Sequence, residues 1–341
     1  MKAVRLHKYE ERPVVEEVPE PEVTGPLDVV VRIGGAGLCR TDLHIYEGQW
    51  ADRSGVTLPY TLGHENAGWV HGVGAGVSNV APGDTVILHP LVSCGLCRAC
   101  RAGDDMHCSS GRFPGIDSDG GMAELLKTGA RACVKLDPSL QPADVAALAD
   151  AGLTAYHAVK KAGPLLYPGT KVVVIGAGGL GHIGIQSLKA LTPAEIIVVD
   201  RSEPALRLAQ SMGADHVVQA DGNQVAQVMD LTDGQGAEVV IDFVGERGAE
   251  ADAWRMTRRA GSHFVIGYGG TVQVPTIDII STERNVIGNL VGTYNDLAEL
   301  MTLAAQGKVK LHTRSYPLDA ANDAMDDLDG GRLQGRGILV P

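Results

Sequence analysis

Four cysteines in one short stretch constrain this chain more than any other feature. Cys94, Cys97, Cys100 and Cys108 follow the pattern C-x2-C-x2-C-x7-C within a chain of 341 residues. At this spacing a single loop can present four thiolates at the corners of a tetrahedron, which favours a closed structural zinc site. The alternatives are two disulfides or four reduced thiols that are simply buried. A closed zinc site stabilises a lobe of the fold but catalyses no reaction.

Composition excludes several classes of protein. With 44% hydrophobic and 21% charged residues, the chain resembles ordinary soluble globular proteins and is long enough for two domains. Its formal net charge of −12 would repel a phosphate backbone, so we expect no nucleic-acid partner. The N-terminus has no apolar signal segment, and no run of about 18 apolar residues occurs. We therefore expect a cytoplasmic protein with reduced thiols and no membrane partner.

The pattern of apolar residues divides the chain into three regions. Residues 1–152 contain short β-branched runs, such as 29–31 and 85–88, separated by Gly and Pro, and they predict an irregular, mostly β domain. In residues 153–291, apolar runs alternate with helical patterns, which predicts parallel βαβ units. The tail ends in another β-like run, 337–340, so we expect the C-terminus to complete the first domain.

A glycine motif opens the alternating region. Gly176, Gly178 and Gly181 form G-x-G-x-x-G directly after an apolar strand, and Asp200 ends the next strand. In this context the glycines permit a tight turn and a close approach to a pyrophosphate, while the acidic residue binds the adenosine ribose hydroxyls. The carboxylate would repel a 2′-phosphate, which favours NAD over NADP. Arg201 follows Asp200 directly. Its guanidinium could lie beside the ribose and tolerate a 2′-phosphate, or it could lie against the adenine face or in solvent.

A second group of possible metal ligands lies in the N-terminal region. Cys39 is followed by Thr41, Asp42 and His44, and His64 is followed by Glu65, which offers a thiolate and an imidazole with carboxylates nearby. Such donors suit a catalytic zinc site, which keeps one coordination position open.

These motifs, in this order, resemble the zinc-dependent alcohol dehydrogenases of the medium-chain dehydrogenase/reductase superfamily. The resemblance covers G-x-C-x-T-D-x-H, G-H-E-x-A-G, the four-cysteine lobe, the glycine motif with Asp200, and the segment 335–337. The segments 120–124 and 288–292 resemble the shorter, typically tetrameric microbial branch. The family implies an α/β protein with a GroES-like mostly-β catalytic domain, 1–152 and 292–341, and a Rossmann doubly wound parallel-sheet coenzyme domain, 153–291. It also implies a homotetramer acting on a small-molecule alcohol or ketone, with NAD and two zinc ions per chain.

The resemblance also implies roles for individual residues. Cys39 and His64 would bind the catalytic zinc, which lowers the pKa of a bound alcohol as it lowers that of water. Thr41 would accept the alcohol proton and pass it through the nicotinamide ribose to His44 near solvent, while the hydride goes to the nicotinamide ring. Asp42 would orient His64. The cofactor-binding residues would be Arg40, Gly176, Gly178, Gly179, Leu180, Gly181, Asp200, Arg201, Val244, Ile266, Gly267 and Arg336, with Arg40 and Arg336 at the pyrophosphate.

The chain departs from the family at one metal ligand. Most members have cysteine in a C-A-G-x-T segment, whereas this chain has Asp150 at that position. Carboxylate oxygen is an accepted zinc ligand, so Asp150 can take the role directly. Alternatively, Asp150 only caps a helix beginning near Leu153, and Glu65 completes the site. The sixth cysteine, Cys133, fits no ligand position and is expected to be a small buried residue.

Two other classes of protein share parts of this pattern. A zinc-free quinone or enone reductase would lack Cys39, His64 and the cysteine lobe, and a non-enzymatic binding protein would not need Thr41 and His44. Within the dehydrogenases, a polyol or L-threonine dehydrogenase is the alternative, since such relatives use carboxylates near the metal. We favour primary or secondary alcohols with apolar or aromatic groups, because the resemblance implies an apolar pocket lined by Trp50, Leu91, Phe113 and Leu290.

Overall fold

The computed structural model describes all residues, 1–341, and its contacts divide the chain into two compact units. The first unit comprises 1–153, 292–307 and 311–341, and the second comprises 154–291 with 308–310. The boundaries expected from the sequence, 152/153 and 291/292, differ from these by one residue at most. The short segment 308–310 belongs with the second unit because Gln186 and the backbone of Lys310 exchange two hydrogen bonds, each 2.9 Å long.

The second unit is built on a parallel sheet with the strand order β11-β10-β9-β12-β13-β14. In chain order this is 3-2-1-4-5-6, the order of a doubly wound dinucleotide-binding sheet. The Rossmann prediction is therefore confirmed. The strands are β9 (Lys171–Ile175), β10 (Glu195–Asp200), β11 (His216–Gln219), β12 (Ala237–Asp242), β13 (Thr257–Val265) and β14 (Asn285–Gly288).

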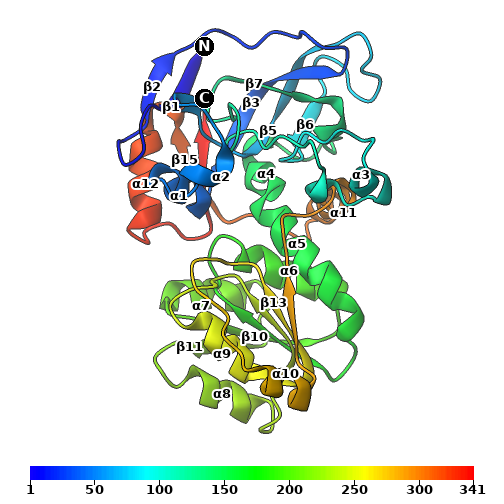
Figure 1. Cartoon of the computed structure of the whole chain (residues 1–341), viewed down its shortest axis with the longest axis vertical. Helices are drawn as coiled ribbons and strands as arrows, with labels where there is room; N and C mark the ends of the chain where they lie inside the picture. The colour runs from blue at the N-terminus through cyan, green and yellow to red at the C-terminus, as the bar shows by residue number, and fades with distance from the viewer. The chain divides into compact units, whose positions relative to one another are not determined.

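Helices cover both faces of this sheet because its strands are apolar on both sides. Val172 and Val174 pack with residues of α5, α6 and α7, whereas Val173 and Ile175 pack with residues of α8 and α9. Successive strand residues point to opposite faces, so the continuous run 172–175 fills both cores. The helices are α5 (Ala151–Ala162), α6 (Gly181–Leu191), α7 (Glu203–Ser211), α8 (Gln224–Leu231), α9 (Ala249–Met256) and α10 (Thr276–Thr282), all of which are labelled in Figure 1.

The first unit is mostly β, as the sequence predicted. A seven-stranded sheet has the order β15-β16-β3-β5-β6-β8 with β7 also paired to β3, and a smaller sheet has the order β2-β1-β4. The C-terminal strand pairs antiparallel with β3, so the tail completes this unit. The strands are β1 (Lys2–Leu6), β2 (Val14–Glu17), β3 (Asp28–Leu38), β4 (Tyr60–Thr61), β5 (Glu65–Val73), β6 (Thr85–Leu88), β7 (Leu125–Gly129), β8 (Cys133–Lys135), β15 (Thr313–Pro317) and β16 (Arg336–Val340).

Short helices connect these strands and carry several of the expected site residues. Helix α1 begins directly after β3, with Cys39 as its N-cap, and Thr293 caps α11 through a reciprocal pair of hydrogen bonds with Asp296. None of the helices is both long and apolar enough to cross a membrane. The helices are α1 (Arg40–Tyr46), α2 (Ala51–Ser54), α3 (Arg98–Ala102), α4 (Pro142–Val145), α11 (Tyr294–Ala305) and α12 (Ala321–Asp329), with 3-10 turns that include η1 (Asp105–His107) and η3 (Ala146–Ala149).

Candidate active site and metal centres

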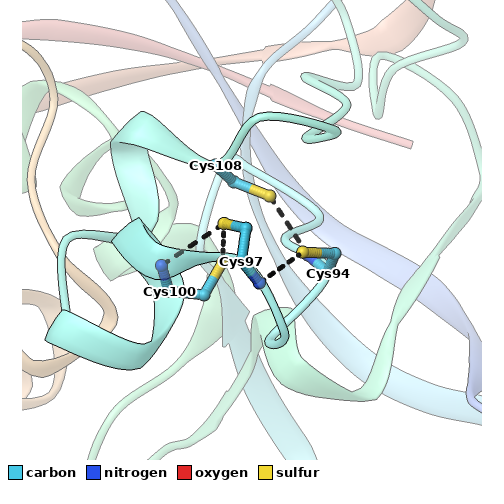
Figure 2. Close-up of side chains that lie close together, drawn as sticks. All are labelled: Cys94, Cys97, Cys100 and Cys108. Atoms are coloured by element: carbon cyan, nitrogen blue, oxygen red, sulfur yellow. Dashed lines mark hydrogen bonds between the residues drawn. The ribbon is translucent and has the colours of Figure 1, made fainter.

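The four cysteines of the 94–108 stretch converge in one lobe of the first unit. Their sulfur atoms all lie within 4.8 Å of one another, and Figure 2 shows the four side chains pointing to a common centre. Backbone amides surround them: Leu96 N–H and Cys97 N–H each donate to Cys94 Sγ at 3.4 Å. Cys100 N–H donates to Cys97 Sγ at the start of α3. A tetrahedral zinc ion is the ligand that this donor set fits.

The local backbone prepares part of the lobe for a cation. Hydrogen bonds from Leu96 and Cys97 amides lower the pKa of Cys94 to about 6, and the Cys100 amide lowers that of Cys97 to about 7. Burial and the neighbouring thiols raise the pKa of Cys100 to about 12. The backbone thus favours the thiolate at two of the cysteines while burial disfavours it at a third, and a divalent cation bound by all four sulfurs would favour the thiolate form of each. Cys133 lies outside the lobe, buried in the core as expected, and burial raises its pKa to about 12.

A second cluster of possible ligands lies at the end of β3 and the start of β5. One donor atom from each of Cys39, His64, Glu65 and Asp150 lies within 4.8 Å of the others. Asp150 reaches this cluster from the junction between η3 and α5, which begins at Ala151 rather than near Leu153. Residues that are distant in sequence thus meet where a catalytic zinc site was predicted.

His64 is held between two carboxylates. Its Nδ1 lies 3.4 Å from Asp42 Oδ1, and its Nε2 lies 3.4 Å from Asp150 Oδ2. Both ring nitrogens are buried and neither has a hydrogen-bond partner. Burial alone would lower the pKa of His64, but the charge of Asp42 and contacts with Asp150 and Cys39 raise it well above 6.5. A cation bound at Nε2 would satisfy the same negative charges, with Asp42 fixing the ring from behind.

Glu65 is engaged differently from Asp150. Its Oε1 accepts a hydrogen bond from Ala151 N–H at 3.0 Å, and its Oε2 pairs with the buried guanidinium of Arg336. A Cβ at Gly37 would lie 2.1 Å from Glu65 Oε2, so only glycine leaves room for this carboxylate. Burial raises the pKa of Glu65, although Arg336 and His64 offset part of that effect. Each Glu65 oxygen thus already has one partner, and Asp150 Oδ2 faces Nε2 of His64.

Helix α1 carries the two residues of the predicted proton relay. Thr41 and His44 are three residues apart, which places them on the same face of the helix, and both side chains are half-buried. The helix is fixed to the metal cluster because Asp42 Oδ2 accepts a hydrogen bond from Cys39 N–H at 2.8 Å. Arg40, on the same helix, forms an ion pair with Asp329 at 3.3 Å and is largely exposed.

The residues of the predicted apolar pocket are divided between the two units. Phe113 lies edge-on to His64, with their ring centroids 5.9 Å apart. Trp50 and Phe113 also pack against the core of the first unit. Leu91 follows His89, whose ring contacts the Leu91 backbone. Leu290 belongs to the second unit, where its side chain is 53% exposed.

The second unit has a cavity of about 480 Å³ at the carboxyl ends of its strands. Predicted cofactor residues Gly176, Asp200, Arg201 and Val244 line it. Other lining residues, chiefly Asp221, Glu246 and Arg247, could not be predicted from the sequence because they lie on loops after β11 and β12 without a recognisable motif.

Glycine geometry explains the turn between β9 and α6. Gly176 has φ of +90°, and a Cβ at Gly181 would lie 1.8 Å from the Gly176 carbonyl oxygen. By contrast, nothing lies within 4 Å of a Cβ placed at the exposed Gly178, so backbone there is open to a ligand. Asp200 braces the same turn, since its Oδ2 accepts a hydrogen bond from Ala177 N–H at 2.7 Å. These observations agree with the roles expected for a phosphate-binding turn.

The remaining predicted cofactor residues fall in three places. Gly179 and Leu180 complete the turn before α6, and Ile266 and Gly267 follow directly after β13. Arg336 is 3% exposed and is engaged by Glu65, a contact that the sequence analysis did not predict. Its predicted contact with the pyrophosphate stays a prediction.

Comparison with known proteins identifies the family. Residues 25–138 match the family described as the alcohol dehydrogenase GroES-like domain, and residues 179–306 match the family described as zinc-binding dehydrogenase. Together these matches cover more than half of the chain. The chain belongs to the zinc-binding alcohol dehydrogenase family.

Individual members of the alcohol dehydrogenase family are similar over the whole length of the chain. The D-arabinose 1-dehydrogenase (NADP(+)) of Saccharolobus solfataricus is 37% identical, covering 100% of this chain and 97% of the relative. The NAD-dependent alcohol dehydrogenase of Sulfolobus acidocaldarius is 36% identical, covering 99% of both chains. Among solved structures, the alcohol dehydrogenase of the hyperthermophilic archaeon Aeropyrum pernix is 48% identical, with a TM-score of 0.97 and 100% of both chains covered.

Proposed function

We propose that this chain is an NAD-dependent zinc alcohol dehydrogenase that interconverts apolar or aromatic alcohols with their aldehydes or ketones. The observation that carries this proposal is the buried cluster of Cys39, His64 and Asp150 beside helix α1 with Thr41 and His44. A purely structural metal site would not need a hydroxyl and an imidazole on one helix face beside it.

The donor set suits a catalytic zinc ion. Cys39, His64 and Asp150 would supply sulfur, nitrogen and oxygen, the three types of donor that zinc accepts in proteins. When bound, zinc supplies a Lewis acid that lowers the pKa of an alcohol, and NAD supplies the hydride acceptor. Asp42 Oδ1 lies 3.4 Å from Nδ1 of His64 and would orient the ring, leaving Nε2 for the metal. The Thr41 hydroxyl would accept the substrate proton and pass it towards His44.

The charge of Asp200 supports NAD as the cofactor. Each of its oxygens accepts one backbone hydrogen bond, from Ala177 and from Ser202, which fixes the carboxylate at the wall of the cavity in the second unit. Each oxygen keeps a further lone pair for a ribose hydroxyl. Arg201 and Arg247 also line this cavity, so charge alone does not bar a 2′-phosphate from it.

A polyol or sugar dehydrogenase is the alternative function. One relative with 37% identity is named a D-arabinose 1-dehydrogenase (NADP(+)), which favours a hydroxyl-rich substrate and the other cofactor. We prefer apolar alcohols because Phe113 lies against His64 and, with Trp50, presents aromatic surface in the first unit.

We also propose that the protein is a homotetramer in the cytoplasm. Strand β14 is the edge of the parallel sheet and leaves Val286 43% exposed. On the preceding helix α10, Ile277 is 65% exposed and Ile280 is 71% exposed. An exposed edge strand beside apolar side chains suits pairing with a second copy. Light scattering after size-exclusion chromatography tests the assembly.

A substrate and cofactor panel tests the proposed function. Purified protein is assayed with NAD and with NADP against 1-hexanol, benzyl alcohol, sorbitol, L-threonine and D-arabinose. We expect the highest kcat/KM with NAD and the apolar alcohols. A preference for D-arabinose with NADP would replace this assignment with the sugar dehydrogenase. Turnover of none of these substrates by protein that contains both zinc ions would contradict the proposed function.

A further inference from the structure

Asp242 and His263 form a buried pair in the second unit that no role described above uses. Asp242 is the last residue of β12, His263 lies in the neighbouring strand β13, and both side chains are 0% exposed. Asp242 Oδ2 and His263 Nε2 are 3.8 Å apart. Asp242 Oδ2 and both ring nitrogens of His263 have no hydrogen-bond partner.

Unpartnered groups of this kind are unusual in a protein core. A buried donor or acceptor without a hydrogen-bond partner destabilises the folded state, and a buried charged group without a partner destabilises it more. Here a donor and an acceptor face each other across a distance slightly longer than a hydrogen bond. A movement of about 1 Å would bring them within hydrogen-bond distance.

Asp242 is hydrogen-bonded to the backbone of the segments that follow β12 and β13, so a movement of its side chain would affect both. Asp242 Oδ1 accepts hydrogen bonds from Val244 N–H and Gly245 N–H, each 2.9 Å long. The Asp242 carbonyl accepts two more, from Ile266 N–H and Gly267 N–H, each 3.0 Å long. One residue therefore sets the shape of both segments that follow β12 and β13.

These two segments are in direct contact, with no space between them. Gly245 has φ of +61°, and a Cβ there would lie 2.0 Å from the Gly267 carbonyl oxygen. A Cβ on Gly267 would lie 2.3 Å from the Val244 carbonyl carbon. Because the backbones touch, a shift of the Asp242 side chain is transmitted to both segments.

The position of these two segments indicates which half of a dinucleotide would lie beside them. A doubly wound sheet binds a dinucleotide across the point where the strand order reverses, with one mononucleotide over each half. Here that point lies between β9 and β12, with Asp200 on the half that takes adenosine. The turns after β12 and β13 belong to the other half, which would take the nicotinamide ribose and ring of a bound dinucleotide.

We propose that His263 is a positioning residue for the nicotinamide half of the cofactor: it donates to Asp242 Oδ2 when the cofactor binds and so fixes the turns at 243–245 and 266–267. The proposal rests on the proposed use of a nicotinamide dinucleotide. It explains why an imidazole, rather than an aliphatic residue, lies in this part of the sheet beside Val240.

Two variants of His263 separate positioning from packing. His263→Phe keeps a ring of similar size but has no donor, whereas His263→Gln keeps an N–H donor. The control Phe264→Leu removes buried volume from the same strand on the opposite face of the sheet, where Phe264 packs with Val172 and Val174. NADH affinity is measured by fluorescence titration and 5′-AMP affinity by calorimetry, together with the melting temperature.

We expect His263→Phe to weaken NADH binding by about 3- to 10-fold, the worth of one hydrogen bond, with AMP affinity unchanged. His263→Gln should restore NADH affinity. Phe264→Leu should lower the melting temperature but should not change NADH affinity relative to AMP affinity. Equal effects of His263→Phe on NADH and AMP, or no effect on either, would overturn the proposal. Failure of the unaltered protein to bind NADH or AMP would instead contradict the proposed function.

A spectroscopic measurement on the unaltered protein covers the case in which His263→Phe does not fold. With 15N-labelled histidine, the ring nitrogen signals of His263 should move towards hydrogen-bonded values on addition of NADH and stay in place on addition of AMP. The resonances are assigned by comparison with His263→Gln. If the ring nitrogen signals of His263 did not move on addition of NADH, the proposal would also be wrong.

Discussion

Arg336 and Glu65 form an ion pair in which both side chains are almost completely buried. Their side chains are 4% and 0% exposed, and the pair joins the C-terminal strand β16 to the start of β5 beside His64. The guanidinium binds Oε2 of Glu65 and also lies close to Cys39, one of the possible metal ligands. Loss of the guanidinium would leave a buried carboxylate without its counter-ion beside the possible metal ligands Cys39 and His64.

Changing Arg336→Met should therefore have two effects. It leaves the Glu65 carboxylate buried without its partner, which should destabilise the protein by about 3–5 kcal/mol in chemical denaturation. It also releases an oxygen that can compete with Asp150 for the metal. The double variant Arg336→Met with Glu65→Gln should recover much of the lost stability. If the single variant were as stable as the unaltered protein, the buried pair would have no structural role.

The cysteine lobe should contribute to stability and not to chemistry. Cys97→Ser removes one sulfur ligand, so zinc measured by mass spectrometry should fall from about two ions per chain to about one. The melting temperature should fall by at least about 5 °C, because zinc binding to such a lobe is folding free energy. The kcat of the remaining folded protein should be close to normal. Cys133→Ser, outside the lobe, is the control and should keep both ions.

Local sequence patterns predicted the Rossmann unit well. The run 172–175, the glycines at 176–181 and Asp200 act within one βαβ unit, so their spacing in the sequence fixes their positions in space. The same holds for the lobe at 94–108, whose four ligands lie within a single loop.

Contacts between distant segments were not predictable in this way. Glu65 and Arg336 are 271 residues apart, and no periodicity or motif links them. The sequence placed Arg336 only at a pyrophosphate contact, because the resemblance offered that role and burial cannot be read from one residue. Similarly, the sequence offered both Asp150 and Glu65 as metal ligands, and nothing in it showed that Ala151 and Arg336 engage the Glu65 oxygens.

Asp28 should make the free energy of unfolding depend on pH in the acidic range. Burial is the largest single effect and raises its pKa, but hydrogen bonds from Gly25 and Thr24 and the ammonium of Lys127 together outweigh burial and lower the pKa to about 2. A carboxyl with a depressed pKa stabilises the folded state above its unfolded pKa near 3.8, and that stability is lost as pH falls towards 2. At pH 7, Asp28→Asn should cost about 1–2 kcal/mol after allowance for partial exposure.

The pH dependence distinguishes this effect from simple loss of packing. Denaturation of Asp28→Asn and of the unaltered protein is compared at pH 7, 5 and 3.5. The difference should be constant between pH 7 and 5 and should shrink at pH 3.5. The exposed Glu22→Gln is the control and should show no difference at any pH. A difference for Asp28→Asn that persists undiminished at pH 3.5 would contradict the charge-based explanation.

The assignment of the third ligand in the proposed catalytic zinc site depends on the role of Asp150. Its Oδ2 lies 3.4 Å from His64 Nε2, and it directly precedes helix α5, so a ligand role and a helix-capping role both fit its position. Asp150→Asn separates the two roles, because asparagine caps a helix as well as aspartate does but carries no negative charge.

If Asp150 is a ligand, Asp150→Asn should lose one of the two zinc ions and at least about 100-fold in kcat/KM. Asp150→Cys should keep both ions, since a thiolate has the same charge and is also a zinc donor. Glu65→Gln is the matched comparison: its oxygens are engaged by Ala151 and Arg336, so it should keep both zinc ions. Two zinc ions and normal turnover in Asp150→Asn, with loss of zinc in Glu65→Gln, would reverse the assignment and make Glu65 the third ligand.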